Sequence, residues 1–147
     1  MTAPTAAVRR DTYTRDVGQC YTCGTTDGLS FQHRRASGMG GSKIQPTVPD
    51  GLTACIVHNE QYEHSLQTIA LAYGWKARKW TDPLRVPAFH LPTFTWYRFE
   101  GIFRVEVTAV VALDMMHAVY GEQYLEWKAI ADTSARAVAL FLRGGAR

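Results

Sequence analysis

Four residues have the types and the spacing that bind a zinc ion. Cys20 and Cys23 form a C-x2-C pair, and Cys55 and His58 form a C-x2-H pair further along the chain. A two-residue spacing on a tight turn brings two ligand atoms together, so two such pairs can occupy the corners of a tetrahedron around one ion. The three cysteines are an odd number and cannot all form disulfides. We therefore expect thiolates that bind zinc in a reducing compartment.

A histidine with two arginines lies between the two pairs. The segment His33-Arg34-Arg35 is followed by a glycine-rich stretch at residues 36–42. A neutral imidazole can accept a proton near pH 7, and a guanidinium group binds phosphate. Held by a metal-stapled hairpin, this combination favours phosphodiester chemistry, with Arg34, Arg35 and Lys43 as contacts to nucleic acid.

Short strands and a helix are expected to position these residues. Apolar and polar residues alternate over residues 29–33, which predicts a strand that ends at the histidine. Residues 52–54 predict a second short strand. Apolar residues then recur every three or four positions over residues 59–73, which predicts a helix that Gly74 terminates.

The second half of the chain predicts a β-hairpin and a long helix. Residues 76–92 are basic and rich in proline, so we expect an irregular connector. Residues 94–107 alternate in polarity around Gly101 and predict the hairpin. The apolar segment 109–120 fits either a strand or a helix, and a helical stripe extends over residues 122–143.

Length and composition indicate a globular chain. Its 147 residues carry a net charge of +3, and 46% of them are hydrophobic. We expect a flexible N-terminal arm at residues 1–17, a zinc module at 18–75 and an extension at 76–147. The N-terminus lacks the apolar stretch of a signal peptide, and no apolar run is long enough to span a membrane. We therefore expect a cytoplasmic protein.

These motifs resemble the HNH endonuclease family, in particular its compact bacteriophage and actinobacterial members. The resemblance covers about residues 18–103 and rests on the two zinc pairs and on the segments QHRR, GMGGS and PDGLTAC. It implies an α+β fold with a treble-clef-like ββα-metal core, in which a structural zinc staples a hairpin to a helix. A C-terminal β-hairpin and a long α-helix would extend this core. It also implies a phage-encoded protein that cuts DNA in the host cytoplasm.

The resemblance implies a role for each residue of the candidate site. His33 matches the general base that takes a proton from the attacking water, while Mg²⁺ or Mn²⁺ stabilises the scissile phosphate. Asp50 falls where the family has an asparagine that orients this base. Asn59 falls at a position that binds the catalytic cation, and Glu63 or His64 would add a ligand one helical turn later.

Three positions depart from the family pattern. Gln32 stands where the family has an aspartate or histidine that binds the cation. Asp50 replaces the asparagine, and its charge would raise the pKa of the histidine. His58 replaces the usual fourth cysteine, which zinc tolerates. In an alternative register, His58 binds the catalytic cation and leaves zinc with three cysteines.

Two other functions remain open. A degenerate HNH module would keep the zinc and the fold and would bind DNA or a phage protein without cutting, as Gln32 and Asp50 suggest. A structural or assembly protein would instead act through the helix at residues 122–143. That helix offers a surface for homo-oligomers or for a phage protein.

Several further residues have an ordinary structural interpretation. Trp75, Trp80 and Trp96 could stack on bases, but we interpret them as core residues. His90 and His117 we interpret as incidental. Cationic side chains also form a second basic patch, at Lys76, Arg78, Lys79 and Arg85.

Overall fold

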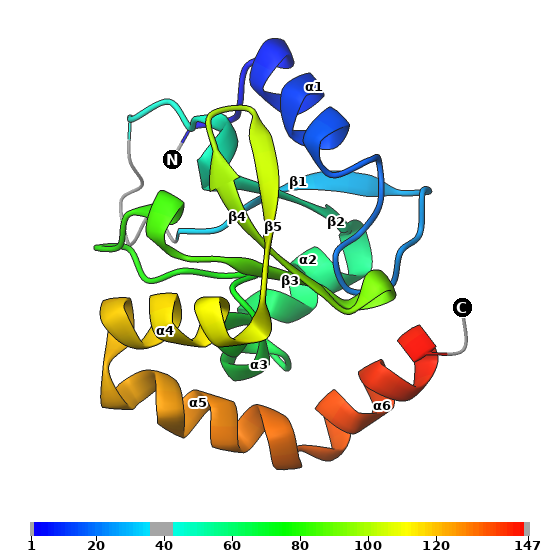
Figure 1. Cartoon of the computed structure of the whole chain (residues 1–147). Coiled ribbons are helices and arrows are strands. Elements are labelled where there is room, and N and C mark those ends of the chain that lie inside the picture. Colours follow the sequence, from blue (N-terminus) through cyan, green and yellow to red (C-terminus); the bar gives the residue numbers. More distant parts are fainter. Residues whose placement is uncertain (1, 36–42, 146–147) are drawn as a thin grey trace.

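The computed structural model describes residues 2–35 and 43–145 and combines two small sheets with short helices (Figure 1). The N-terminal half contains α1 (Ala6–Arg15), β1 (Leu29–His33), β2 (Gly51–Cys55), α2 (Ile56–Glu63) and α3 (Gln67–Ala72). The C-terminal half contains β3 (Ala88–His90), β4 (Thr95–Glu100), β5 (Phe103–Val107), α4 (Ala109–Tyr120), α5 (Glu122–Thr133) and α6 (Ala135–Gly145). The fold is therefore of the mixed α and β class. The glycine-rich segment 36–42 lies outside the described residues.

The first sheet is the expected two-stranded hairpin. β1 and β2 pair antiparallel, with Leu29 opposite Cys55 and His33 opposite Gly51. Helix α2 follows directly on β2 and packs against both strands. Cys55 is at once the last residue of β2 and the N-cap of α2, where its sulfur accepts a hydrogen bond from the backbone N–H of His58.

The second sheet has the strand order β3-β4-β5 and contains the predicted β-hairpin. β4 and β5 pair antiparallel around Gly101, whose φ of +57° is the left-handed conformation that favours glycine in a turn. The proline-rich connector was expected to be irregular, but its residues 88–90 form the edge strand β3. The ambiguous segment that follows the hairpin is helical and forms α4.

Both long helices expected from the sequence are broken. The first begins at Ile56 and is interrupted at His64, whose backbone angles are not helical, before α3 begins. The C-terminal helix is interrupted at Ser134, which is extended and whose hydroxyl accepts a hydrogen bond from the N–H of Arg136. Serine favours helix starts for this reason. Among the described helices, none combines the length and the apolar character needed to cross a membrane.

The N-terminal segment is a helix rather than the expected loose arm. Helix α1 begins after Thr5, whose hydroxyl caps it, and ends in a buried ion pair between Arg15 and Asp16. The Arg15 guanidinium also donates to the carbonyl of Gly51, and the Asp16 carboxylate accepts from the N–H of Thr53. These contacts attach α1 to β2.

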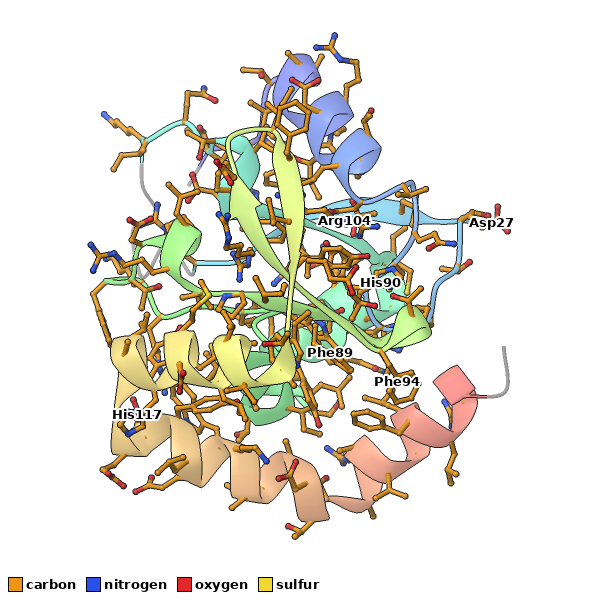
Figure 2. The ribbon with its side chains drawn as sticks, in the orientation of Figure 1. Asp27, Phe89, His90, Phe94, Arg104 and His117 are labelled. Carbon is orange, nitrogen blue, oxygen red and sulfur yellow. The ribbon has the colours of Figure 1, made fainter. Side chains whose placement is uncertain are left out.

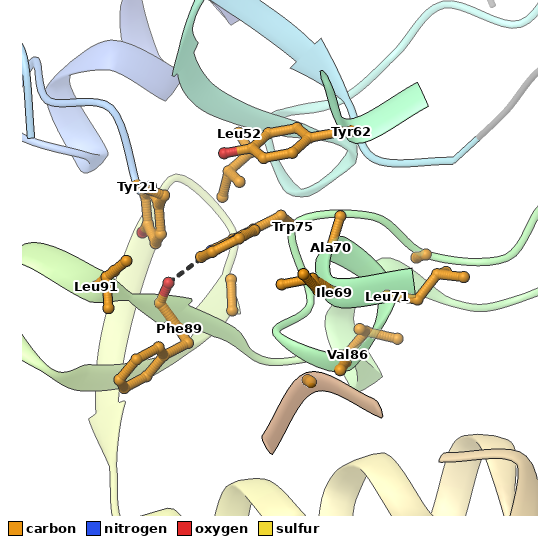
Figure 3. Close-up of a cluster of buried hydrophobic side chains, with 14 of the residues drawn as sticks. Tyr21, Leu52, Tyr62, Ile69, Ala70, Leu71, Trp75, Val86, Phe89 and Leu91 are labelled. Carbon is orange, nitrogen blue, oxygen red and sulfur yellow. Dashed lines mark hydrogen bonds between the residues drawn. The ribbon is translucent and has the colours of Figure 1, made fainter. Parts of the chain in front are cut away.

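The core joins the two halves around Trp75 (Figure 3). Its indole N–H donates to the carbonyl oxygen of Phe89 on β3 at 2.7 Å, and its ring stacks on Tyr62 of α2. Ile69 of α3 and Leu91 after β3 are buried in the same cluster. The N-terminal half and the C-terminal half therefore share one hydrophobic core.

Replacing Gly74 with alanine should destabilise the protein strongly. Gly74 has a φ of +70°, and a Cβ there would overlap the carbonyl oxygen of Pro87. We expect the free energy of unfolding to fall by on the order of 4 kcal/mol in urea denaturation. The matched control is Gly101→Ala, which has φ +57° but no atom within 4 Å of the new Cβ. It should cost only about 1–2 kcal/mol, and equal losses in both variants would contradict the proposed clash.

Candidate metal centre

Three cysteines and one histidine meet where the turn before β1 approaches the start of α2. The ligand atoms of Cys20, Cys23, Cys55 and His58 all lie within 4.8 Å of one another. The Cys55 sulfur is 3.9 Å from the Cys23 sulfur, and His58 Nδ1 is 3.2 Å from Cys55 and 3.7 Å from Cys20. A tetrahedral zinc with ordinary bond lengths separates its ligand atoms by about 3.5–3.8 Å. The four residues therefore fit one metal ion such as zinc.

Local backbone geometry explains why these ligands converge. Gly24 has a φ of +72°, and its N–H donates to the carbonyl of Cys20, which closes a tight turn around Cys23. On the other side, the junction of β2 and α2 places Cys55 at the helix start and His58 within the first turn. A strand that ends directly in a helix thus supplies two ligands.

Hydrogen bonds within the cluster already favour thiolates. A hydrogen bond with Cys20 lowers the pKa of Cys23 to about 3 and that of Cys55 to about 6. The same hydrogen bonds raise the pKa of Cys20, because a third thiolate would lie beside two others. Burial alone would lower the pKa of His58, but the neighbouring sulfurs outweigh it and raise the pKa. A bound divalent cation would take the place of these protons.

In the alternative register, His58 would bind a catalytic cation apart from the cysteines, but the structure places it with them. His58 lies with the three cysteines, whereas His33 lies at the opposite end of the hairpin from Cys55. Four residues of extended strand separate these ends by about 13 Å. The candidate general base and the metal cluster are therefore two sites, linked by β1.

The environment of His33 favours the neutral imidazole. The side chain is partly exposed at the end of β1, and its ring meets Phe31 edge-on at 5.1 Å. Burial lowers the pKa of His33, and the positive charges of Arg9 and Lys76 lower it further. The negative charge of Asp50 acts in the opposite direction but does not outweigh them. Its Nδ1 atom is buried and has no hydrogen-bond partner among the described residues.

The carboxylate of Asp50 is directed to other partners than His33. It accepts hydrogen bonds from Arg35 at 2.7 Å and from both the N–H and the hydroxyl of Thr47. Within the described residues, no hydrogen bond joins it to His33. The expectation that Asp50 orients the base is therefore not met in this conformation.

Arg34 was expected to contact phosphate, but in the structure it is a buried residue that connects segments of the fold. Its side chain is fully buried and donates to the carbonyl oxygens of Gly74, Pro83 and Val86. The guanidinium also lies 4.8 Å from the ring centre of Phe99. The position of Arg34 next to the histidine in the sequence does not reveal that its side chain is buried.

The other predicted nucleic-acid contacts reach the surface to different degrees. Arg35 is half-buried and donates to the Asp50 carboxylate and to the carbonyl of Thr81. Lys43 is exposed. In the second basic patch, Lys76 is buried and paired with Glu63.

The expected ligands of a catalytic cation are brought together only in part. Asn59 of α2 donates to the Ser30 hydroxyl at 2.8 Å, and Ser30 shares a face of β1 with Gln32. Gln32 is 2% exposed, and its amide nitrogen has no hydrogen-bond partner among the described residues. Glu63 is occupied by the lysine at position 76, and His64 is exposed beyond the end of α2.

Within residues 2–35 and 43–145, the cysteine–histidine cluster is the one group of three or more such ligands that could hold a metal. A second, preassembled cage for Mg²⁺ or Mn²⁺ is not found there.

The other two histidines are carried by β3 and α4 (Figure 2). His90 is 1% exposed on β3, and its Nδ1 hydrogen-bonds the Thr93 hydroxyl. His117 projects from α4 towards Glu122, with 4.0 Å between its Nε2 atom and Oε1 of the glutamate. Both fit the structural interpretation made from the sequence.

The interpretation of the tryptophans as core residues holds for two of the three. Trp75 and Trp96 are 1% and 9% exposed, but Trp80 is 67% exposed. The basic and proline-rich sequence around Trp80 is the signal that indicates its surface position.

Comparisons with known proteins identify no relative of this chain. No protein-family model matches it, and no curated protein or solved structure is significantly similar to it. The functional conclusion therefore rests on the site itself.

The purified protein should contain one zinc ion per chain, bound by the cluster. Replacing Cys23 with serine removes a thiolate ligand, so we expect loss of the metal and a fall in unfolding free energy of at least about 3 kcal/mol. Elemental analysis and urea denaturation measure the two effects. His117→Ala, an exposed histidine outside the cluster, should leave both unchanged. A metal-free protein of full stability would contradict the assignment.

Acid should destabilise the fold in part through His90. Burial, with a contribution from the Arg104 charge, lowers its pKa to about 4, against about 6.5 in an unfolded chain. Between these values only the unfolded chain takes up the proton, so stability is lost as the pH falls from about 6.5 towards 4, by about 2 kcal/mol. Urea denaturation across this range should show a smaller loss in His90→Gln. An equal loss in both proteins would exclude this role.

Proposed function

We propose that the chain is a metal-dependent endonuclease of the HNH type that hydrolyses DNA phosphodiester bonds. The observation that carries the proposal is a partly exposed histidine, its pKa lowered by burial, at the end of a hairpin strand whose other end lies at the candidate metal cluster. The order β1, β2, α2 around that cluster supports a ββα-metal core. Such an enzyme would act on DNA in the cytoplasm.

His33 would act as the general base in this proposal. Its lowered pKa leaves the ring uncharged at neutral pH, so the ring can take a proton from a water molecule that attacks phosphorus. The backbone of His33 pairs with that of Gly51 in the β1–β2 hairpin, which fixes the position of the histidine backbone. Because no side chain among the described residues accepts from its Nδ1, the ring would be positioned by β1 and by the contact with Phe31.

Gln32 and Asn59 would hold the divalent cation that this chemistry needs. The amide nitrogen of Gln32 is buried, and the part of the chain that the structure describes offers it no hydrogen-bond partner. A half-turn of the amide would place its oxygen there as a ligand. Mg²⁺ commonly retains several waters and binds substrate phosphates, so few protein ligands are required. When bound, such a cation would stabilise charge on the scissile phosphate.

A second candidate function is DNA or protein binding without cleavage. The observation in its favour is that the carboxylates near the base are already neutralised, Asp50 by Arg35 and Glu63 by Lys76. In that case the zinc-stapled core would be retained as a binding module. A phage protein or a second copy of the chain could then dock on the C-terminal helices.

A plasmid-nicking assay with Mg²⁺ or Mn²⁺ tests the proposal. We expect His33→Ala to slow nicking by at least about 100-fold, because a general base contributes that much to the rate. His117→Ala should cut at the rate of the unchanged protein, and His33→Ala should keep its full zinc content. Equal nicking in all three proteins would reject His33 as the base. Binding of DNA without any nicking would favour the second candidate function.

A further inference from the structure

Trp80 is an exposed aromatic ring between two grooves. Its exposed fraction is 67%, against 1%, 9% and 6% for Trp75, Trp96 and Trp127, so it is the exposed one of four tryptophans, all within the described residues. One groove, of about 570 Å³, separates the Trp80 segment from α4. The other, of about 470 Å³, lies between the same segment and Arg35. An indole this accessible does not contribute to the core as the other three do.

The ring is held from one side. Its edge meets Tyr120 of α4, with ring centres 5.8 Å apart and planes at 77°. Tyr120 is itself buried, and its hydroxyl accepts a hydrogen bond from the backbone N–H of Arg78. This support restrains the indole while most of its surface stays accessible, which is what a stacking platform requires.

The charges around Trp80 are mainly positive. Lys79 precedes it and is exposed, and the Arg85 side chain beside the larger groove is 79% exposed. Arg35 lines the second groove. Two acidic side chains line the grooves among the described residues. Asp82 lines both and lies 4.0 Å from Arg85, and Asp50 lines the second and pairs with Arg35. A phosphate backbone therefore complements this surface better than an acidic peptide would.

The segment that carries Trp80 is attached to the end of β1. Arg35, two residues after His33, donates to the carbonyl of Thr81 and pairs with Ala77 in a β-bridge. Arg34 donates to the carbonyl of Pro83 in the same segment. The two arginines beside the candidate base thus fix the position of the exposed tryptophan relative to it.

We propose that Trp80 stacks on an unpaired base of single-stranded DNA, with the neighbouring phosphates against Lys79 and Arg85. This inference rests on the proposed function in naming DNA as the ligand, but it concerns binding and does not require cleavage. Every base has an aromatic face, so the platform would accept any sequence. Strand regions without pairing, rather than intact duplex, would be the preferred ligand.

Fluorescence anisotropy with a labelled oligothymidylate tests the inference. We expect Trp80→Ala to weaken binding by roughly 5- to 150-fold, the range for loss of one stacked base, and Trp80→Phe to keep most of the affinity. The matched control is Phe103→Ala on β5, an aromatic residue that is also 67% exposed but lies outside both grooves. It should bind as the unchanged protein does.

A second readout uses the tryptophan itself. Acrylamide quenches exposed tryptophans, so added oligothymidylate should protect the intrinsic fluorescence of the full chain, and this protection should vanish in Trp80→Ala. The inference is overturned if the oligonucleotide does not bind, if Trp80→Ala binds as tightly as the unchanged protein, or if the variant weakens a blunt duplex equally. None of these results would change a finding that nicking depends on His33. The proposal for Trp80 can therefore be rejected while the proposed function stands, and the reverse is also true.

Discussion

The buried guanidinium of Arg34 is the interaction on which the arrangement of the two halves depends. No carboxylate is hydrogen-bonded to it among the described residues, and three backbone carbonyls and the face of Phe99 compensate its charge instead. Burial lowers its pKa to about 10, so the group remains charged at neutral pH. A buried cation is costly unless its hydrogen bonds are satisfied. Those partners therefore fix where the end of β1 meets the segment that begins at Gly74.

The metal cluster and this arginine constrain opposite ends of the same strand. At the Leu29 end, the cysteines and His58 fasten the hairpin to α2, and at the His33 end, Arg34 and Arg35 fasten it to the Trp80 segment. Between them the strand has little freedom. The candidate base and the exposed tryptophan are consequently connected through the hydrogen bonds of Arg34 and Arg35.

The elements that could be predicted from the sequence are those whose signals are local. Alternating polarity located β1 and the hairpin around Gly101, and paired two-residue spacings located the four residues of the candidate metal cluster. Helix α1 was missed because it has no apolar stripe and is anchored by a buried ion pair instead. A polar anchor of this kind leaves no periodic pattern in a sequence.

The site residues that were misjudged depend on contacts between distant segments. Whether Arg34 meets phosphate or backbone carbonyls is decided by residues 74–86, which no spacing around the histidine reveals. The partners of Asp50 were also not predictable from local spacing, because its carboxylate accepts hydrogen bonds from Arg35 and Thr47. The exposure of Trp80 likewise depends on the tertiary structure. Residue type indicated the chemistry available to each side chain, and tertiary structure decided which partner it met.

The last helix, α6, contributes an aromatic side chain to the centre of the molecule. Phe141 of α6 lies 5.6 Å from Tyr73, which follows α3, and 5.6 Å from Phe94, by ring centres, and it also approaches Phe89 of β3. An aromatic side chain from the C-terminus thus covers rings that belong to the middle of the molecule. A fragment that stops before α6 would leave those rings open to water. The half that carries the cysteine–histidine cluster thus shares its aromatic packing with the C-terminal helix, and a cut between them would divide that packing.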